Sequence, residues 1–232
     1  MKIAVFGTGV VGQTLAGRFH TLGHQVIVGT RNVENTMTRN TRDSYGGPTF
    51  SEWYRTNNDI KVATYADAAA FAEIVINATS GSASLSALKM AGVAPLNSKV
   101  LIDVANPLDS SKGMPPVLIP SMCNTTSLGE EIQRSFPKLN VVKALNTMWC
   151  GLMINPSMIA DGNHNVFLCG NSVSAKSTVV QLLSEFGWKQ EKIVDLGDIS
   201  ASRGMEMILP LWLRVMMTRG NGTFNFDIVS SS

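Results

Sequence analysis

The stretch MKIAVFGTGVVG at residues 1–12 decides the fold. Its apolar run at residues 1–6 predicts a strand, and three glycines follow it in the pattern G-x-G-x-x-G. Beyond them, Val11, Leu15 and Phe19 recur every four residues and predict one apolar face of a helix. A strand, a glycine turn and a helix are the setting in which this pattern binds a dinucleotide.

Each glycine of this turn has its own role in binding. Gly7 permits the tight turn, Gly9 lets the backbone approach a pyrophosphate, and Gly12 lets the helix pack against the strand. The N–H groups at the helix start and the positive end of the helix dipole are expected to hold the phosphates. The candidate cofactor-binding residues here are Gly7, Thr8, Gly9, Val10, Val11 and Gly12.

The end of the second predicted strand, residues 24–29, indicates which dinucleotide binds. NAD-binding units usually place an Asp or Glu there, about 20 residues after the glycines, to accept from the ribose 2′-hydroxyl. This chain has Thr30, Arg31 and Asn32 instead, and its next carboxylate is Glu34. A guanidinium forks onto a 2′-phosphate, whereas a carboxylate would repel it. We therefore predict that Thr30, Arg31 and Asn32 bind NADP(H) rather than NAD(H).

The composition is that of a globular protein with a lightly charged surface. Of 232 residues, 44% are hydrophobic and 16% are charged, and the formal net charge is +2. Because no dense basic cluster occurs, nucleic acid is not an expected partner. No apolar stretch reaches the ~18 residues of a membrane span, so a membrane is not expected either. The sequence opens directly on its first strand, so no signal peptide is expected.

The cysteines and histidines indicate neither disulfides nor a metal site. Cys123, Cys150 and Cys169 are far apart without a C-x-x-C pair, which suits a reducing cytoplasm. Cys169 ends an apolar run and is expected to be a core residue. The three histidines have no metal-ligand spacing, so we predict that the protein holds no metal.

Strands and helices alternate along the chain, which predicts an α/β protein with a Rossmann-like, doubly wound, mostly parallel sheet of about eight strands. The expected strands are residues 1–6, 24–29, 61–64, 73–78, 99–104, 140–145, 165–169 and 192–196, and the expected helices include residues 65–72, 127–136, 173–186 and 200–218. Residues 33–58 are polar and turn-rich, which predicts a long loop with one helical turn at 50–55. We expect one NADP-binding domain over residues 1–232. Within it, residues 1–107 bind the dinucleotide, and residues 108–232 complete the sheet and form an acceptor pocket and a dimer interface.

Polar residues follow the fourth and fifth predicted strands. Thr79 and Ser80 follow the fourth strand, and Asn106 and Pro107 follow the fifth. In an open parallel sheet, ligands bind outside the carboxyl ends of the strands, where the strand order switches. We expect these four residues to contact the nicotinamide half of the cofactor; the alternative is two ordinary polar loops.

The last predicted helix, residues 200–218, is apolar nearly all round. One face comprises Met205, Ile208, Leu209, Trp212, Val215 and Met216, and Leu211 and Leu213 add apolar surface on the other side. Such a helix is buried on several sides, which predicts a subunit interface or the wall of a second ligand pocket, with ordinary core as the alternative. Pro210 should kink it. The tail at residues 223–228 alternates with period two and predicts a half-buried strand.

Over essentially its whole length the chain resembles the NADP oxidoreductases that exchange hydride with the 5-deazaflavin coenzyme F-420, in particular a bacterial branch of that family. The resemblance rests on GTGVVG at residues 7–12, VGTRN at 28–32, VVKALNT at 141–147, VFLCGN at 166–171, DLGDISASRGMEMILPLW at 195–212 and the phenylalanine-containing tail. Many dehydrogenases share the first motif, and the central and C-terminal motifs are more specific.

The resemblance implies a role for each matching residue. Residues 8–11 match the pyrophosphate turn, and Thr30 with Arg31 match the 2′-phosphate pair. Thr79 and Ala144 would border the nicotinamide. The candidate substrate-binding residues are Asn146, Thr147, Met148 and Met207, and the last belongs to a helix that walls the deazaflavin pocket. Family members are commonly dimers, so a homodimer is expected.

Two departures from the family pattern lie near the expected acceptor pocket. Asn146 stands where the archaeal enzymes carry a histidine. Residues 79–82, with the sequence TSGS, replace a bulkier segment that carries proline and tryptophan. Both departures bear on the second substrate rather than on NADP(H).

Hydride transfer between a nicotinamide and a flavin-like ring needs stacking and orientation and little acid–base chemistry. A carbonyl or imine reductase needs a proton donor, and the sequence offers no clear one. Lys143 and Asn146 lie three residues apart at a strand end, unlike the Lys/Asn pair of hydroxyacid dehydrogenases, which needs a turn of helix. No catalytic side chain is identified.

We therefore predict an NADP(H)-dependent oxidoreductase that exchanges hydride with a small-molecule acceptor, namely coenzyme F-420 or a flavin. Two alternatives remain. One is a small imine or carbonyl reductase related to pyrroline-carboxylate reductases. The other is a non-catalytic NADP(H) redox sensor.

Overall fold

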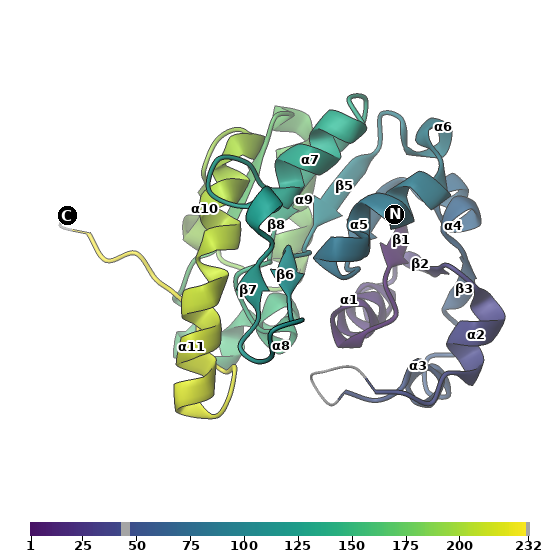
Figure 1. Ribbon diagram of the computed structural model, residues 1–232, viewed down its shortest axis with the longest axis horizontal. Helices are drawn as coiled ribbons and strands as arrows, with labels where there is room; N and C mark the ends of the chain where they lie inside the picture. The colour runs from purple at the N-terminus through teal and green to yellow at the C-terminus, as the bar shows by residue number, and fades with distance from the viewer. Residues whose placement is uncertain (43–46, 231–232) are drawn as a thin grey trace. The chain divides into compact units, whose positions relative to one another are not determined.

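The computed structural model describes residues 1–42 and 47–230 (Figure 1). Eight strands form a mostly parallel sheet in a Rossmann-like α/β fold, which confirms the predicted fold class. Each of these strands begins and ends within one residue of its predicted bounds. The chain divides into two compact units: unit 1 comprises Met1–Ala105 and Arg134–Asn140, and unit 2 comprises Asn106–Gln133 and Val141–Ser232.

Unit 1 contains five parallel strands in the order β5-β4-β1-β2-β3. They are β1 (Lys2–Phe6), β2 (Gln25–Thr30), β3 (Lys61–Thr64), β4 (Ile74–Asn77) and β5 (Val100–Asp103). The chain adds β2 and β3 on one side of β1 and then β4 and β5 on the other, so the strand order switches between β1 and β4. Phe6 pairs with Asn77 at the carboxyl ends of these two strands. This switch point is where an open parallel sheet binds its ligand.

The helices of unit 1 are α1 (Val10–Thr21), α2 (Val33–Thr38), α3 (Phe50–Tyr54), α4 (Tyr65–Phe71), α5 (Gly81–Ala91) and α6 (Val93–Leu96). On α1, Leu15 and Phe19 are buried, as the four-residue spacing predicts. The helical turn predicted at residues 50–55 is confirmed as α3, whereas the rest of the predicted loop is wrong at residues 33–38, which form α2. Asn32 caps α2, and a capping box between Thr49 and Glu52 starts α3. Residues 43–46 of that predicted loop lie outside the described residues.

In unit 2, β8 (Asn140–Ala144) runs antiparallel to β9 (Val166–Gly170), and β9 runs parallel to β10 (Ile193–Asp195). A separate hairpin pairs β6 (Leu108–Asp109) with β7 (Val117–Leu118). The helices are α7 (Leu128–Ser135), α8 (Cys150–Ile154), α9 (Val173–Glu185), α10 (Ser202–Met207) and α11 (Leu209–Arg219). Short 3-10 segments lie at Pro120–Met122, Pro156–Met158, Ala160–Gly162, Gln190–Lys192 and Ile199–Ala201. Cys169 is fully buried, as expected of a core residue.

The last predicted helix is divided at Ile208 into α10 and α11, and Pro210 lies in the first turn of α11. Ile208 keeps helical backbone angles, φ −70° and ψ −21°, and its N–H and carbonyl bond to Gly204 and Trp212 as in a helix. The kink at Pro210 stays a prediction. Leu213, from the less apolar side, is as buried as Trp212, whereas Leu211 is exposed.

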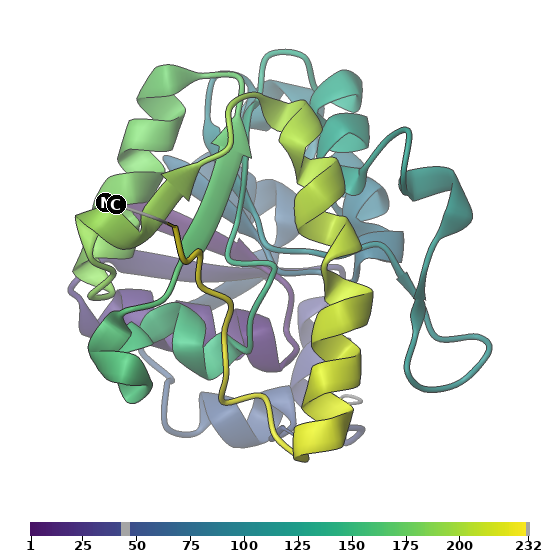
Figure 2. The same cartoon turned by 90° about the vertical axis from the view of Figure 1, so that its left-hand side faces the viewer.

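The prediction of a strand at residues 223–228 is wrong. The tail turns back from the end of α11, drawn in yellow in Figure 2, and its extended backbone forms no strand ladder. Its backbone bonds instead go to Asn165, which donates its N–H to the Phe226 carbonyl (3.1 Å) and accepts from the Ile228 N–H at Oδ1 (2.7 Å). Phe224 stacks on Trp212 with 5.2 Å between ring centroids. These two hydrogen bonds to Asn165 and the packing of Phe224 therefore hold this segment, without the ladder of a strand.

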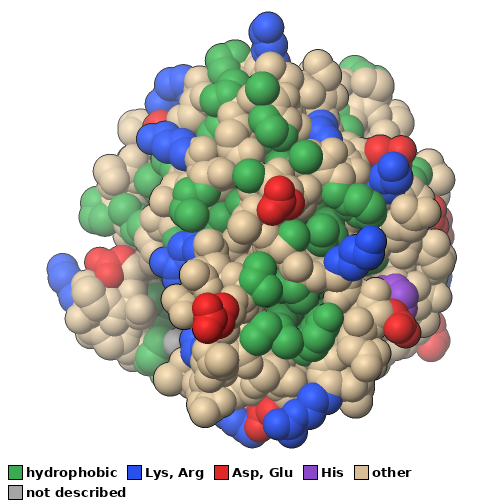
Figure 3. Space-filling model, turned by 90° about the vertical axis from the view of Figure 1, so that its right-hand side faces the viewer, with side chains coloured by type: hydrophobic (Ala, Val, Ile, Leu, Met, Phe, Trp, Pro, Cys, Tyr) green, Lys and Arg blue, Asp and Glu red, His purple; other side chains and the backbone are tan. Residues whose placement is uncertain are grey.

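The surface carries mixed charge and some exposed apolar side chains. On the face drawn in Figure 3, basic and acidic side chains are interspersed among hydrophobic ones. On α10 and α11, Met207, Leu211 and Met217 are exposed. None of the helices in the described ranges is long and apolar enough to cross a membrane.

Candidate functional site

The glycine turn after β1 has the geometry that its sequence predicts. Gly7 has a φ of +122°, and a Cβ on it would lie 2.3 Å from the Ala78 carbonyl oxygen. A Cβ on Gly12 would lie 2.2 Å from the Gly7 carbonyl oxygen. Gly9 caps α1, whose first turn contains no acidic side chain to neutralise the helix dipole. The start of α1 is therefore suited to a phosphate group.

Two side chains hold Thr8 in this turn, and the sequence alone did not indicate either. Gln13 is buried, and its Nε2 donates to the Thr8 carbonyl at 3.0 Å and to the Pro48 carbonyl at 3.2 Å. Arg39 donates from Nη2 to Thr8 Oγ1 at 3.1 Å. Both contacts join the turn to residues that follow α2, namely Arg39 and Pro48. They therefore form only if the chain after α2 folds back onto the glycine turn.

At the end of β2, the predicted 2′-phosphate residues differ in exposure. Thr30 is buried, and its Oγ1 shares a hydrogen bond with Thr36 Oγ1 at 2.6 Å. Asn32 accepts at Oδ1 from the Asn35 N–H at 2.8 Å, so it caps α2. Arg31 is exposed and forms no ion pair within the described chain. Burial raises the pKa of the Tyr65 phenol, and the positive charge of Arg31 acts to lower it.

At the end of β4, a buried polar cluster fixes Thr79. Asn77 donates from Nδ2 to Asp103 Oδ1 at 2.8 Å and to Ser84 Oγ at 3.0 Å, while its Oδ1 accepts from Thr79 Oγ1 at 2.6 Å. Asn77 and Asp103 are fully buried. Ser80 is exposed at the N-cap of α5 and joins this cluster only through its carbonyl, which accepts from Ser84 Oγ at 3.2 Å. Polar residues that end apolar strands, as Asn77 and Asp103 do, were the sequence signal for this cluster.

In unit 2, the structure brings Asn106 and Asn146 together. Asn106 Nδ2 donates to the Asn146 carbonyl, and Asn146 Nδ2 donates to Asn106 Oδ1, both at 2.8 Å. Asn146 Nδ2 also donates to the Met205 carbonyl at 2.9 Å, which ties the end of β8 to α10. Asn146 Oδ1 is buried and has no hydrogen-bond partner among the described residues. Leu145, just before it, has a φ of +63°, a strained value of the kind that gathers at functional sites.

The other predicted residues of unit 2 divide by exposure. Ala144, Thr147, Met148 and Pro107 are buried, whereas Met207 is 45% exposed. Pro107 accepts at its carbonyl from the Ile119 N–H at 2.8 Å. Of this group, Met207 presents the most side chain to a ligand.

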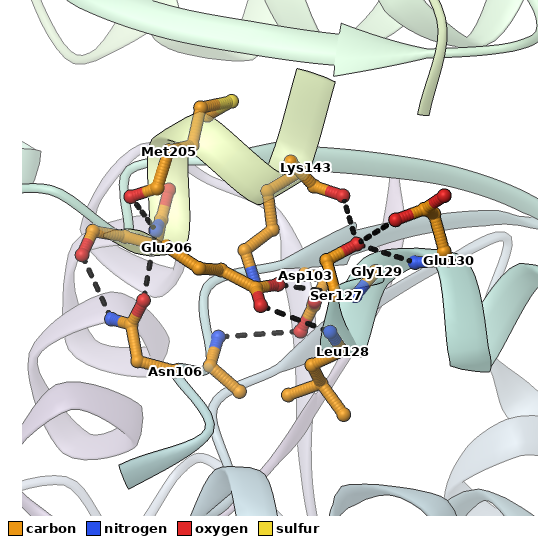
Figure 4. A network of polar contacts seen from close by, with 12 residues as sticks. Asp103, Asn106, Ser127, Leu128, Gly129, Glu130, Lys143, Met205 and Glu206 are labelled. Carbon is orange, nitrogen blue, oxygen red and sulfur yellow. Dashed lines mark hydrogen bonds and ion pairs between the residues drawn. The ribbon is translucent and has the colours of Figure 1, made fainter. Parts of the chain in front are cut away.

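A buried ion pair joins α10 to β8 (Figure 4). Lys143 Nζ lies 2.8 Å from Glu206 Oε1, and the two side chains are 0% and 1% exposed. The Glu206 carboxylate also accepts the N–H groups of Leu128 (2.9 Å) and Gly129 (3.1 Å) at the start of α7. Arg203, on the same helix, forks onto Glu130 of α7 through Nε and Nη2. Lys143 thus bonds to the Glu206 carboxylate at the start of α7. The sequence spacing of Lys143 and Asn146 gave no indication of this contact.

Comparisons with known proteins point to one group. Residues 2–107 match the family described as NADP oxidoreductase, coenzyme F-420-dependent. A crystal structure of a candidate F-420-dependent NADP reductase from Arthrobacter sp. FB24 is 48% identical, covers 99% of this chain and 100% of that chain, and has a TM-score of 0.91.

Two further relatives are more distant. Metalloreductase STEAP3 of Rattus norvegicus is 28% identical over 217 residues, which span 91% of this chain but 38% of that protein. An imine reductase from Streptomyces aurantiacus has a TM-score of 0.62 at 14% identity, covering 94% of this chain and 64% of that one. At that identity the likeness extends to the fold alone.

Proposed function

Because this chain belongs to the family of coenzyme F-420-dependent NADP oxidoreductases, and is therefore an NADP-dependent oxidoreductase, we propose that it exchanges hydride between NADP(H) and a flavin-like or deazaflavin ring. The observation that carries the proposal is the 48% identity to the Arthrobacter protein along 99% of the chain. The glycine turn agrees with a dinucleotide cofactor, and Arg31, which has no ion pair among the described residues, agrees with a cofactor that carries a 2′-phosphate.

When bound, the cofactor supplies or takes up a hydride at its nicotinamide ring. The task of the protein is to position the two rings. In this proposal the start of α1 binds the pyrophosphate, and Arg31, with Thr30 and Asn32 beside it, binds the 2′-phosphate. Thr79, Ser80, Asn106, Pro107 and Ala144 are the proposed nicotinamide contacts.

The acceptor ring is assigned to Asn146, Thr147, Met148 and Met207. Asn146 supports this assignment because Asn106 and the Met205 carbonyl fix its amide while its Oδ1 has no partner in the described chain. A buried acceptor without a partner is costly, and a donor on a ligand would satisfy it. Flavins and deazaflavins carry a ring N–H, which is such a donor.

The main rival, reduction of an imine or carbonyl, needs a proton donor at the acceptor atom. Lys143 of β8 and Glu206 of α10 are ionisable, but they face each other and are buried. The Glu206 carboxylate is further occupied by the N–H groups that start α7. This arrangement favours transfer to a ring, which needs no such donor.

The proposal predicts rapid oxidation of NADPH by a deazaflavin. In stopped-flow absorbance at 340 nm, protein and NADPH would be mixed separately with coenzyme F-420, FMN, FAD and a cyclic imine. We expect oxidation with the ring acceptors, fastest with coenzyme F-420. Oxidation by the imine alone would contradict the proposal and favour the reductase. Tight NADPH binding without turnover of any acceptor would favour the redox sensor.

The exposed apolar side chains of α11 support a homodimer through this helix. We expect light scattering at micromolar concentration to give twice the 25.0 kDa of one chain. Met217→Glu, on a residue that is 50% exposed, should shift the protein towards the monomer because a charge in an apolar interface is costly. Met90→Glu, on α5, is the control, because Met90 is similarly exposed at 48%. A wild-type monomer, or equal effects of both substitutions, would contradict this interface.

A further inference from the structure

Arg39 lies next to the glycine turn although 31 residues separate it from Thr8 in the sequence. It follows the last residue of α2, where the backbone leaves the helix for an extended conformation with φ −69° and ψ 120°. From there its Nη2 donates to Thr8 Oγ1 at 3.1 Å. Thr8 precedes Gly9, the N-cap of α1. The guanidinium is therefore held beside the start of a helix of 12 residues.

No carboxylate among the described residues pairs with the Arg39 guanidinium. Within the described chain it forms no ion pair, and its hydrogen bond goes to a neutral hydroxyl. Arg42, three residues later, differs in this respect because it lies 3.2 Å from the Glu52 carboxylate. A guanidinium has five N–H donors, and Thr8 takes one of them. The remaining donors are available for an anion.

A second contact keeps Thr8 in place under this guanidinium. The buried Gln13 donates from Nε2 to the Thr8 carbonyl and to the Pro48 carbonyl. The backbone of the turn is thus fixed from the α1 side, while the Thr8 hydroxyl accepts from Arg39. Arg39 is exposed, so its placement does not depend on burial in the core. An arginine held by a neutral hydroxyl at a phosphate-binding helix start is suited to a bidentate contact with a phosphate oxygen pair.

We propose that Arg39 binds the pyrophosphate of the dinucleotide; this inference rests on the proposed NADP(H) function. Two arginines then bind different phosphate groups of the cofactor. Arg31, at the end of β2, contacts the 2′-phosphate, which NADPH has and NADH lacks. Arg39, at Thr8, contacts the pyrophosphate, which both cofactors have. Arg31 therefore determines the preference for NADPH over NADH, whereas Arg39 raises the affinity for both cofactors equally.

The test compares the dissociation constants of NADPH and NADH by titration of the protein. Arg39→Gln should weaken both cofactors by the same factor, about tenfold, because one charge-assisted contact is lost in each complex. Arg39→Lys keeps the positive charge but not the planar guanidinium, so the affinities for NADPH and NADH should fall less than with Arg39→Gln. Arg42→Gln is the matched control: it removes the same charge three residues away, from an arginine that a carboxylate already pairs, and should leave both constants unchanged.

Each outcome decides the inference. An equal loss with Arg39→Gln and none with Arg42→Gln would support it. A loss for NADPH alone would overturn it and assign Arg39 to the 2′-phosphate. Equal losses with both variants would also overturn it, because general electrostatics would then explain the effect. Wild-type protein that binds neither cofactor would instead overturn the proposed function itself.

Discussion

Replacing Glu206 with Ala is expected to lower the free energy of unfolding by about 3–5 kcal/mol, because it leaves the buried Lys143 ammonium without the carboxylate that faces it. The Leu128 and Gly129 N–H groups lose their acceptor at the start of α7 as well. Urea denaturation followed by tryptophan fluorescence measures the loss. Three of the four tryptophans, Trp149, Trp188 and Trp212, lie in unit 2 with this pair, so the signal reports mainly on that unit.

Asp195→Asn is the control for this prediction. Lys176 and Asp195 are also 2.8 Å apart, but the aspartate side chain is 51% exposed. Removing such a surface pair should cost no more than about 1 kcal/mol. In a second control, Lys143→Met combined with Glu206→Leu should cost less than Glu206→Ala alone, because both charges of the pair are removed together. Similar small losses for Glu206→Ala and Asp195→Asn would contradict the importance of the buried pair.

Arg31→Asp is expected to reverse the preference for NADPH over NADH. A charge-assisted contact to the 2′-phosphate contributes about 1.5–3 kcal/mol, so its loss should lower NADPH affinity about 10- to 150-fold. The introduced carboxylate repels the phosphate and can accept from the 2′-hydroxyl of NADH. Because Arg31 is exposed and has no ion pair in the described chain, the substitution should not disturb the fold. Equilibrium titration with both cofactors measures the ratio.

Arg31→Lys separates charge from geometry at the same position. It retains the positive charge but loses the planar fork, so NADPH affinity should fall less than with Arg31→Asp. Circular dichroism would confirm that both variants are folded. If Arg31→Asp kept the NADPH affinity of the wild type, the assignment of Arg31 to the 2′-phosphate would be wrong.

The fold could be predicted from the sequence where hydrophobic periodicity determines it. The strands of unit 1 are short apolar runs that end in glycine or polar residues, so their bounds could be read closely. The strand predicted at residues 223–228 was wrong because a period of two shows only which side chains face the core. It does not show whether another strand lies alongside to form hydrogen bonds. Phe224 and Phe226 alternate inward, but they pack against the apolar cluster of Leu209, Trp212 and Leu213. The small helix α2 could not be predicted in this polar segment, since its Asn32 cap rather than an apolar face starts it, whereas a helical turn was predicted at the position of α3.

The candidate site was predictable where a local motif carries it. The glycine turn needs only neighbours in sequence, and the structure has the close approaches that exclude a Cβ at Gly7 and Gly12. Contacts between residues that are far apart in the sequence could not be predicted from a local motif. Lys143 and Glu206 are 63 positions apart in the sequence, and each stands in an otherwise apolar stretch. A lysine and a glutamate interrupting two apolar segments were the only signal that they would pair.

The division of the chain has a consequence for how the protein is made. Unit 1 is not contiguous: Arg134–Asn140 returns to it after 28 residues that belong to unit 2. Within unit 1, the Ser98 N–H donates to the Lys138 carbonyl and the Asn140 N–H donates to the Lys99 carbonyl, so this late segment bonds the residues just before β5. In the sheet, β5 lies between β4 and β8, and β8 begins only at Asn140. During translation, the glycine turn therefore emerges long before the last segment of unit 1, Arg134–Asn140, has been synthesised. A nascent chain halted at residue 107 would leave the edge of β5 that β8 pairs in the sheet open to other chains.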